Sequence, residues 1–180
     1  MKHFLFLIAL LCALPLARGA EGDELRSFRN ENVGTVTLVA SRDWKPVERH
    51  HINFGTTFYR LLPPVEGEFD LEILVNDLAH MKMDALVDKD LEIYIESNMA
   101  RAAPQSVEGK ATAIRFGGQR DGVYARLTDK APRPGEFLWF TQGVRLQSKK
   151  VVLFTLYSND KDGSILKKAL VIVESVKFEQ

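Results

Sequence analysis

Residues 136–157, EFLWFTQGVRLQSKKVVLFTLY, contain two long apolar runs separated by a short polar break. The break at 147–150 has the length of a hairpin loop, so residues 136–146 and 151–157 are predicted to pair as antiparallel strands. Within 137–140 and 151–154 both alternating faces are apolar, which is typical of central strands that are covered on both sides. The sequence therefore predicts a sheet with further structure on each face.

Two segments have the apolar spacing of helices that could cover these faces. In residues 164–177 apolar side chains recur every three or four positions, and Asp162 or Ser164 can cap the first turn. The β-branched run 171–173 is also compatible with a strand, but the helical stripe extends past it on both sides. Residues 89–102 carry a similar stripe. We therefore predict helices at 89–102 and 164–177.

The remaining strand candidates are apolar or alternating runs that are bounded by Gly and Pro. They lie at 36–39, 52–62, 69–74, 111–116 and 123–128. The last two are joined by the glycine-rich residues 117–122, which tolerate positive φ, and should form a hairpin. The predicted order is three strands, a helix, four strands and a helix. Because consecutive hairpins require antiparallel neighbours, the fold class is α+β, with a mainly antiparallel sheet covered by two main helices.

The first twenty residues, MKHFLFLIALLCALPLARGA, have the features of a secretory signal peptide. Lys2 provides a positive start, residues 4–14 are apolar, and small residues precede a cleavage site after Gly19 or Ala20. No later run approaches about 18 uninterrupted apolar residues, so no transmembrane anchor is expected. We predict export to the periplasm, or secretion.

The remainder of the chain has the length of one domain. Residues 21–29 are rich in charged side chains and are predicted to form a flexible arm. Residues 30–180 contain no long linker or low-complexity segment, so they are predicted to form a single α+β domain. With residues 1–20 removed as a signal peptide, the mature protein is expected to be soluble.

The composition excludes several kinds of chemistry. The full chain has 24 Lys and Arg against 24 Asp and Glu, and removal of residues 1–20 leaves 22 against 24. A weakly acidic protein has no electrostatic preference for phosphate backbones, so no nucleic-acid partner is expected. The single cysteine, Cys12, lies in the predicted signal peptide. A mature protein without cysteine has no thiol catalysis, thiol redox chemistry or thiolate metal site.

Several features, taken in order, resemble a known family. They are Trp44 near the first strand, the Gly-Val-Tyr start of a hairpin strand at 122–124, the aromatic stretch 136–140 and the closing helix 164–176. This pattern resembles the PsbP-like and DcrB-like α/β/α sandwich family over most of the mature chain. The resemblance implies an exported, non-catalytic binding or assembly role, with an envelope protein or a small ligand as partner and no cofactor. It supplies no catalytic residue.

The histidines are the basis of the alternative function, a metal-binding protein or a hydrolase. His50 and His51 are adjacent, so on a strand their side chains point to opposite faces and cannot chelate one ion together. Asp77, His80 and Asp84 have spacings of three and four, which on a helix would bring them to one side, as a metal site requires. Apolar residues surround them in the sequence, which favours a loop or short helix that packs inward.

A second polar group lies before the last helix. Ser158, Asp160, Asp162 and Gly163 imitate the start of a calcium-binding loop, but the twelfth position falls on Ala169, where the loop requires a bidentate Glu. We interpret the segment as a turn followed by a helix cap.

The best candidates for a ligand or partner surface are Tyr124, Arg126 and Trp139. Tyr124 and Arg126 lie on one face of a hairpin strand, and Tyr and Arg are favoured at interfaces. The other aromatic residues of the two long strands could line a ligand groove, but are expected mostly in the core. They are Phe137, Phe140, Phe154 and Tyr157.

Overall fold

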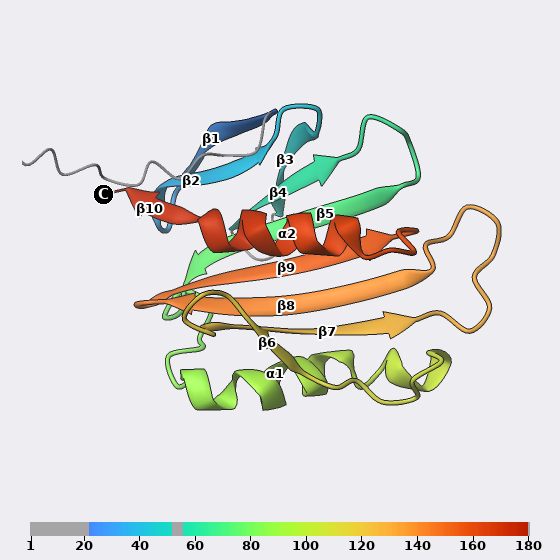
Figure 1. The fold of residues 1–180 in the computed structure, drawn as a ribbon. Coiled ribbons are helices and arrows are strands. Elements are labelled where there is room, and N and C mark those ends of the chain that lie inside the picture. The colour runs from blue at the N-terminus through green and yellow to red at the C-terminus, as the bar shows by residue number, and fades with distance from the viewer. Residues whose placement is uncertain (1–21, 52–55, 180) are drawn as a thin grey trace, which may run out of the picture.

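The computed structural model describes residues 22–51 and 56–179, without the side chains of residues 49–51, 56 and 57. In these residues the chain forms ten strands and two α-helices (Figure 1). The strands are β1 (Asp23–Asn30), β2 (Gly34–Ser41), β3 (Lys45–His51), β4 (Thr56–Leu62), β5 (Phe69–Asp77), β6 (Ile114–Phe116), β7 (Gly122–Thr128), β8 (Trp139–Gln147), β9 (Lys150–Ser158) and β10 (Lys177–Glu179). The helices are α1 (Leu91–Met99) and α2 (Ser164–Ser175).

The strands form two antiparallel sheets. The larger sheet has the order β3-β4-β5-β9-β8-β7-β6, and the smaller has the order β1-β2-β10. The predicted hairpin of β8 and β9 pairs from Trp139 opposite Ser158 to Gln147 opposite Lys150. Its turn includes Ser148 in the left-handed region, with φ 59°. Strand β9 is thus the middle strand of the larger sheet, where coverage on both faces was predicted.

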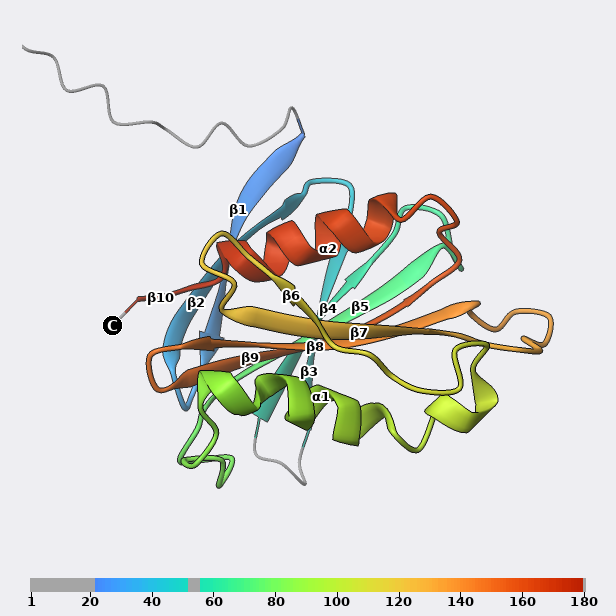
Figure 2. The same ribbon diagram turned by 60° about the horizontal axis from the view of Figure 1, so that its bottom comes forward.

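The two helices lie on opposite faces of the larger sheet (Figure 2). Helix α2 packs Leu166 and Val173 into a core that includes Phe154 of β9. Helix α1 packs Ile95 and Met99 into a second core over β7 and β8. The predicted α+β fold, a mainly antiparallel sheet with a helix on each face, is confirmed.

The prediction of a flexible arm at 21–29 is wrong for residues 23–29, which belong to β1 and pair with β2 along its whole length. The ring of Phe28 packs on Tyr59, with centroids 4.3 Å apart. Asn30 is buried, and its side-chain amide donates to the carbonyl of Val75 at 3.0 Å. The charged side chains do not prevent pairing, because Arg29 points to solvent and the buried Arg26 donates to the carbonyl oxygen of Ser41 at 2.9 Å.

Two other predicted boundaries also differ from the structure. The single strand predicted at 52–62 is β4, and a separate edge strand, β3, precedes it and contains Pro46. An edge strand tolerates proline because one side of its backbone needs no hydrogen-bond donor. The last helix ends at Ser175 rather than residue 177, and the strand alternative for 171–173 is not observed. The other predicted strands correspond to β2 and β5–β9, with ends shifted by up to three residues.

The start of α2 is capped by two carboxylates. Asp162 Oδ1 accepts a hydrogen bond from the backbone N–H of Ser164 at 2.9 Å, as the sequence predicted. Asp160 Oδ2 also accepts a hydrogen bond from the backbone N–H of Ile165 at 2.6 Å, which the sequence did not predict. Both bonds satisfy helix donors that would otherwise have no partner. The calcium-like segment is therefore a turn and cap.

Neither α1 nor α2, the two helices of the described chain, has the length and apolar character that a membrane crossing requires.

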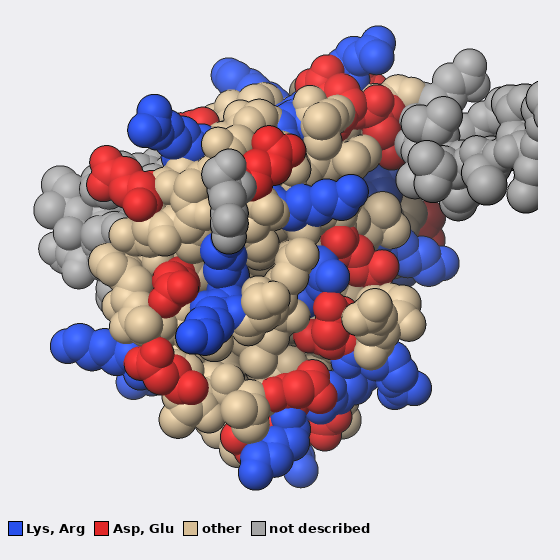
Figure 3. Space-filling view, turned by 90° about the vertical axis from the view of Figure 1, so that its left-hand side faces the viewer, with Lys and Arg blue, Asp and Glu red and all other residues tan. Residues whose placement is uncertain are grey.

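Figure 3 shows one end of the molecule, where basic and acidic side chains are interspersed and neither sign gathers into a large patch.

The core beneath α2 depends on a glycine. The ring of Phe154 lies over Gly143 on the neighbouring strand β8, so a Cβ atom at position 143 would be 2.1 Å from the ring. The same atom would be 2.9 Å from the backbone carbonyl oxygen of Val123. Neither contact is sterically possible without movement of the ring or the sheet.

We predict that Gly143→Ala lowers the free energy of unfolding by about 2 kcal/mol, because Phe154 must leave its position in the core. Urea denaturation followed by circular dichroism measures this change. Gly118→Ala is the control, because a Cβ atom there meets nothing within 4 Å. Equal unfolding midpoints for the two variants would contradict this account of the core.

Candidate functional site

Helix α1 covers only part of its face of the larger sheet. It packs on β7 and β8, and residues of β9 on the same face become more exposed along the strand. Val151 is fully buried, Leu153 and Thr155 are half-buried, and Tyr157 is 38% exposed. The opposite face of β9 is buried from Val152 to Ser158. Part of the sheet is thus left open beside α1.

We call this region the open face and define it by side chains from four adjacent strands. They are Phe58 of β4, Asp70, Glu72 and Leu74 of β5, Leu153, Thr155 and Tyr157 of β9, and Phe140 and Gln142 of β8. The strand register arranges several of them in rows. Glu72, Thr155 and Gln142 are direct cross-strand neighbours and form a polar row, whereas the rows on either side contain apolar or aromatic side chains.

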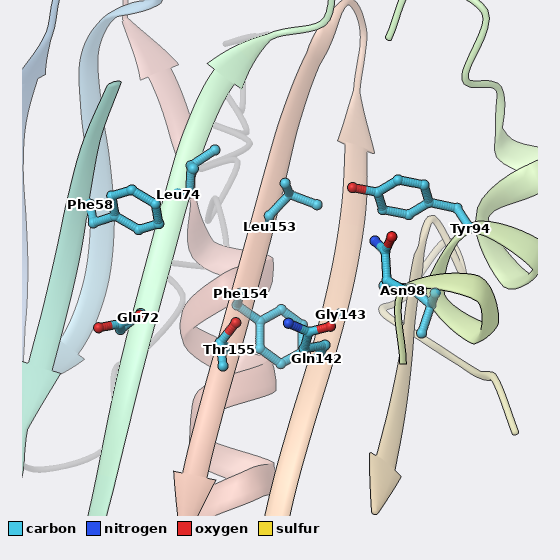
Figure 4. A pocket seen from close by; sticks show the side chains of 11 residues that line it. Phe58, Glu72, Leu74, Tyr94, Asn98, Gln142, Gly143, Leu153, Phe154 and Thr155 are labelled. Atoms are coloured by element: carbon cyan, nitrogen blue, oxygen red, sulfur yellow. The ribbon is translucent and has the colours of Figure 1, made fainter. Parts of the chain in front are cut away.

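The first depression of the open face, the inner hollow, has a volume of about 330 Å³. It lies between α1 and the sheet, and Figure 4 shows Tyr94 and Asn98 of α1 pointing toward the strands. The polar row forms part of its floor. The apolar side chains that line it from this face are those of Phe58, Leu74, Ile95 and Leu153. A small number of polar groups among apolar side chains is the usual composition of a ligand pocket.

The second depression, the outer hollow, has a volume of about 880 Å³ and is bordered by residues 129–138. Three aromatic rings line it. The Tyr157 ring stacks on Phe140 with centroids 5.2 Å apart and an angle of 24° between the planes, and it lies 6.0 Å from Phe137. Because Phe140 and Tyr157 are paired next to Gln142 and Thr155, the two hollows adjoin along β8 and β9.

One ion pair and one further carboxylate determine the charge of the open face. The Arg60 guanidinium binds both carboxylate oxygens of Asp70, with Nε 2.6 Å from Oδ1. Hydrogen bonding to Asp70 raises the pKa of Arg60. Glu72 lies 4.0 Å from Arg60 Nε, at the outer limit of an ion pair, and accepts no hydrogen bond from the described side chains. Burial raises the pKa of the Tyr157 phenol, and the charges of Glu72 and Asp70 raise it further.

The structure places Tyr124, Arg126 and Trp139 on the opposite face, under α2. The Arg126 guanidinium lies over the Trp139 ring, 4.5 Å from its centroid, and donates to the carbonyl oxygen of Asp160 at 3.2 Å. Tyr124 contacts the ring of Phe116. These contacts join β7, β8 and the loop before α2. The role of the three residues as a partner surface stays a prediction.

The structure gives no support for the predicted metal alternative at Asp77, His80 and Asp84. The segment after β5 forms turns rather than a helix, so the spacing of three and four does not align the side chains. Asp77 Oδ1 instead accepts a hydrogen bond from the backbone of Ala79 at 2.8 Å. No three His, Asp or Glu side chains in the described ranges are grouped to hold a metal ion. Met81 packs against the α1 core, as predicted.

His50 and His51 are the last residues of β3, and their side chains lie outside the part of the chain that the structure describes. The backbone register places them opposite Thr57 and Thr56 of β4. Their catalytic or metal-binding role stays a prediction.

Comparison with known proteins concerns the fold alone. No protein-family model matches this sequence, and a search of curated proteins found no match. The solution structure of cyanobacterial PsbP (CyanoP) from Synechocystis sp. PCC 6803 is similar over 91% of this chain and 96% of that chain, with a TM-score of 0.48 and 14% identity. At this identity and this TM-score, the likeness identifies no ligand and no site.

A crystal structure of a protein from Bacteroides thetaiotaomicron VPI-5482 is also similar, with a TM-score of 0.44 and 12% identity. The match covers 81% of this chain but only 45% of that chain. This chain therefore corresponds to less than half of the Bacteroides protein.

The charge of the open face generates a prediction about Tyr157. We expect Glu72→Gln to lower the pKa of the Tyr157 phenol toward its usual value, because one of the two charges that raise this pKa is removed. Titration of ¹³C-labelled tyrosine by NMR measures the change. Tyr59 is the internal control, because burial and the charge of Glu48 raise its pKa to about 12, and Glu72 takes no part. An unchanged Tyr157 pKa in the variant would show that Glu72 does not act on the open face.

Proposed function

We propose that this protein is an exported, non-catalytic binding protein that holds its ligand on the open face. The observation that carries this proposal is the partial cover of β9, which leaves aromatic and apolar side chains half-exposed beside an ordered polar row. Removing apolar surface from water provides about 25 cal/mol per Å², so a ligand that covers these side chains is stabilised. The polar row fixes its orientation.

The residues that line the two hollows support binding rather than catalysis. The described lining includes no histidine, cysteine or serine, and hence no nucleophile paired with a histidine base. Arg60 and Asp70 form a close ion pair beside the open face, and their charges balance. The side chains of the open face also stand on hydrogen-bonded strands, which hold them in place before a ligand arrives.

We propose export from the character of residues 1–20. In a bacterial host that expresses the full chain, we expect a periplasmic protein whose intact mass corresponds to a start at residue 20 or 21. Leu10→Arg, which places a charge in the apolar run, should leave the precursor uncleaved in the cytoplasm. Recovery of the unmodified chain with all 180 residues in the cytoplasm would contradict export.

The binding proposal is tested by NMR with the mature protein and a fragment library of sugars, blocked dipeptides, aromatic amines and aromatic acids. We expect at least one class to shift amide signals of β5, β8 and β9. Thr155→Arg should abolish these shifts, because the new side chain fills the polar row between the two hollows. Val171→Arg is the matched control, since Val171 is 60% exposed on α2, which covers the other face.

A library whose members shift no signal on the open face would overturn the proposal. Ligands that bind Thr155→Arg as tightly as the unmodified protein would also overturn it. Thermal unfolding of both variants should remain cooperative, because both positions are at least partly exposed.

A further inference from the structure

We propose that the inner hollow recognises an organic ammonium ion attached to an apolar body, and that Glu72 is the residue that selects its charge. This inference rests on the proposed function of the open face and specifies the ligand class. It follows from the charge of the hollow, the chemistry of the groups around Glu72 and the shape of the lining.

The charge of the described groups is the first argument. Arg60 donates hydrogen bonds to both carboxylate oxygens of Asp70, which balances its charge. Glu72 is the one charged residue among the described side chains that line the inner hollow. Its side chain is 35% exposed, and it has no hydrogen-bond donor among the described residues. Glu72 lies 4.0 Å from the Arg60 guanidinium, which already binds Asp70, so two carboxylates share one cation. The excess negative charge lies at Glu72, in the inner hollow.

The neighbours of Glu72 are the second argument. Thr155 and Gln142 continue the row across β9 and β8, and Asn98 reaches the same hollow from α1. Each has a side-chain oxygen that can accept a hydrogen bond. An ammonium group has three donors and no acceptor, so a carboxylate with several oxygen acceptors beside it complements this group. A carboxylate or phosphate ligand would be repelled by Glu72.

The lining of the hollow is the third argument. Phe58, Leu74 and Leu153 provide apolar surface beside the polar row, and Tyr94 adds an aromatic ring from α1 (Figure 4). Aromatic rings attract cations through their negative faces, whereas aliphatic side chains cover an apolar body. The volume of about 330 Å³ lies within the range of small-ligand sites. Together these groups fit an amine that is apolar at one end.

The probes are phenethylammonium, phenethyl alcohol and phenylacetate, which share a phenyl ring and differ in charge. Each measurement uses the unmodified mature protein and is repeated with Arg49→Gln, because Arg49 occupies the register position opposite Phe58. NMR titration of the mature protein gives Kd and the shifted residues. We expect phenethylammonium to bind about tenfold more tightly than phenethyl alcohol, with phenylacetate weakest.

Glu72→Gln should remove the preference for the cation while binding of the alcohol is retained. Glu66→Gln changes the net charge equally at an exposed turn outside the inner hollow and should leave the preference intact. Equal binding of cation and alcohol in the inner hollow would overturn this inference but support the proposed function. Absence of binding by all three probes would overturn the inference, whereas the fragment library decides the proposed function separately.

A free amine and a lysine side chain share this chemistry. An end-blocked Phe-Lys-Phe peptide distinguishes the two sources in the same titration. If the peptide binds at least tenfold more tightly than phenethylammonium, and Glu72→Gln removes this difference, the ammonium group is that of a lysine side chain in a peptide. Binding weaker than that of phenethylammonium would assign it to a small amine.

Discussion

The two faces of the larger sheet are covered to different extents, and the open face and its two hollows depend on this difference. Seven strands about 4.8 Å apart span roughly 29 Å, whereas one helix with its side chains is about 10 Å wide. On one face, α2 is joined by β1 and β2, whose Phe28 and Leu38 extend the same core. On the other face, α1 covers β7 and β8. The open face exists because the smaller sheet has no counterpart there.

The sequence predicted the fold best where local alternation decides burial. Apolar residues on both faces of 151–154 predicted a central strand, and β9 is one. The prediction of a flexible arm at 21–29 was wrong because Phe28 and Asn30 are buried by contacts with Tyr59 and Val75, which are remote in sequence. The spacing of Asp77 and His80 would align their side chains on a helix, but the chain forms turns at these residues.

The open face was harder to predict than the fold because no local pattern contains it. Glu72, Thr155 and Gln142 are single polar residues in three apolar strands, and they become one row only through the registers of β5, β9 and β8. Strand spacing in the sequence is compatible with a groove lined by Tyr157 and Phe140, but it favours the core for both. Arg126 and Trp139, which the sequence suggested as surface residues, contact each other, and Arg126 also contacts the loop before α2. Whether a strand residue can bind a ligand depends on whether another element covers its side chain. That element can lie far away in the sequence, as α1 does from β9.

Side-chain accessibility along β9 tests the unequal cover most directly. A neutral paramagnetic cosolute, added to the mature protein, broadens the NMR signals of side chains that solvent reaches. We predict broadening that increases from Val151 through Leu153 to Tyr157, while Val152 and Phe154 on the α2 face remain sharp. Equal protection of both faces would show that the sheet is covered on both sides, and the open face would not exist.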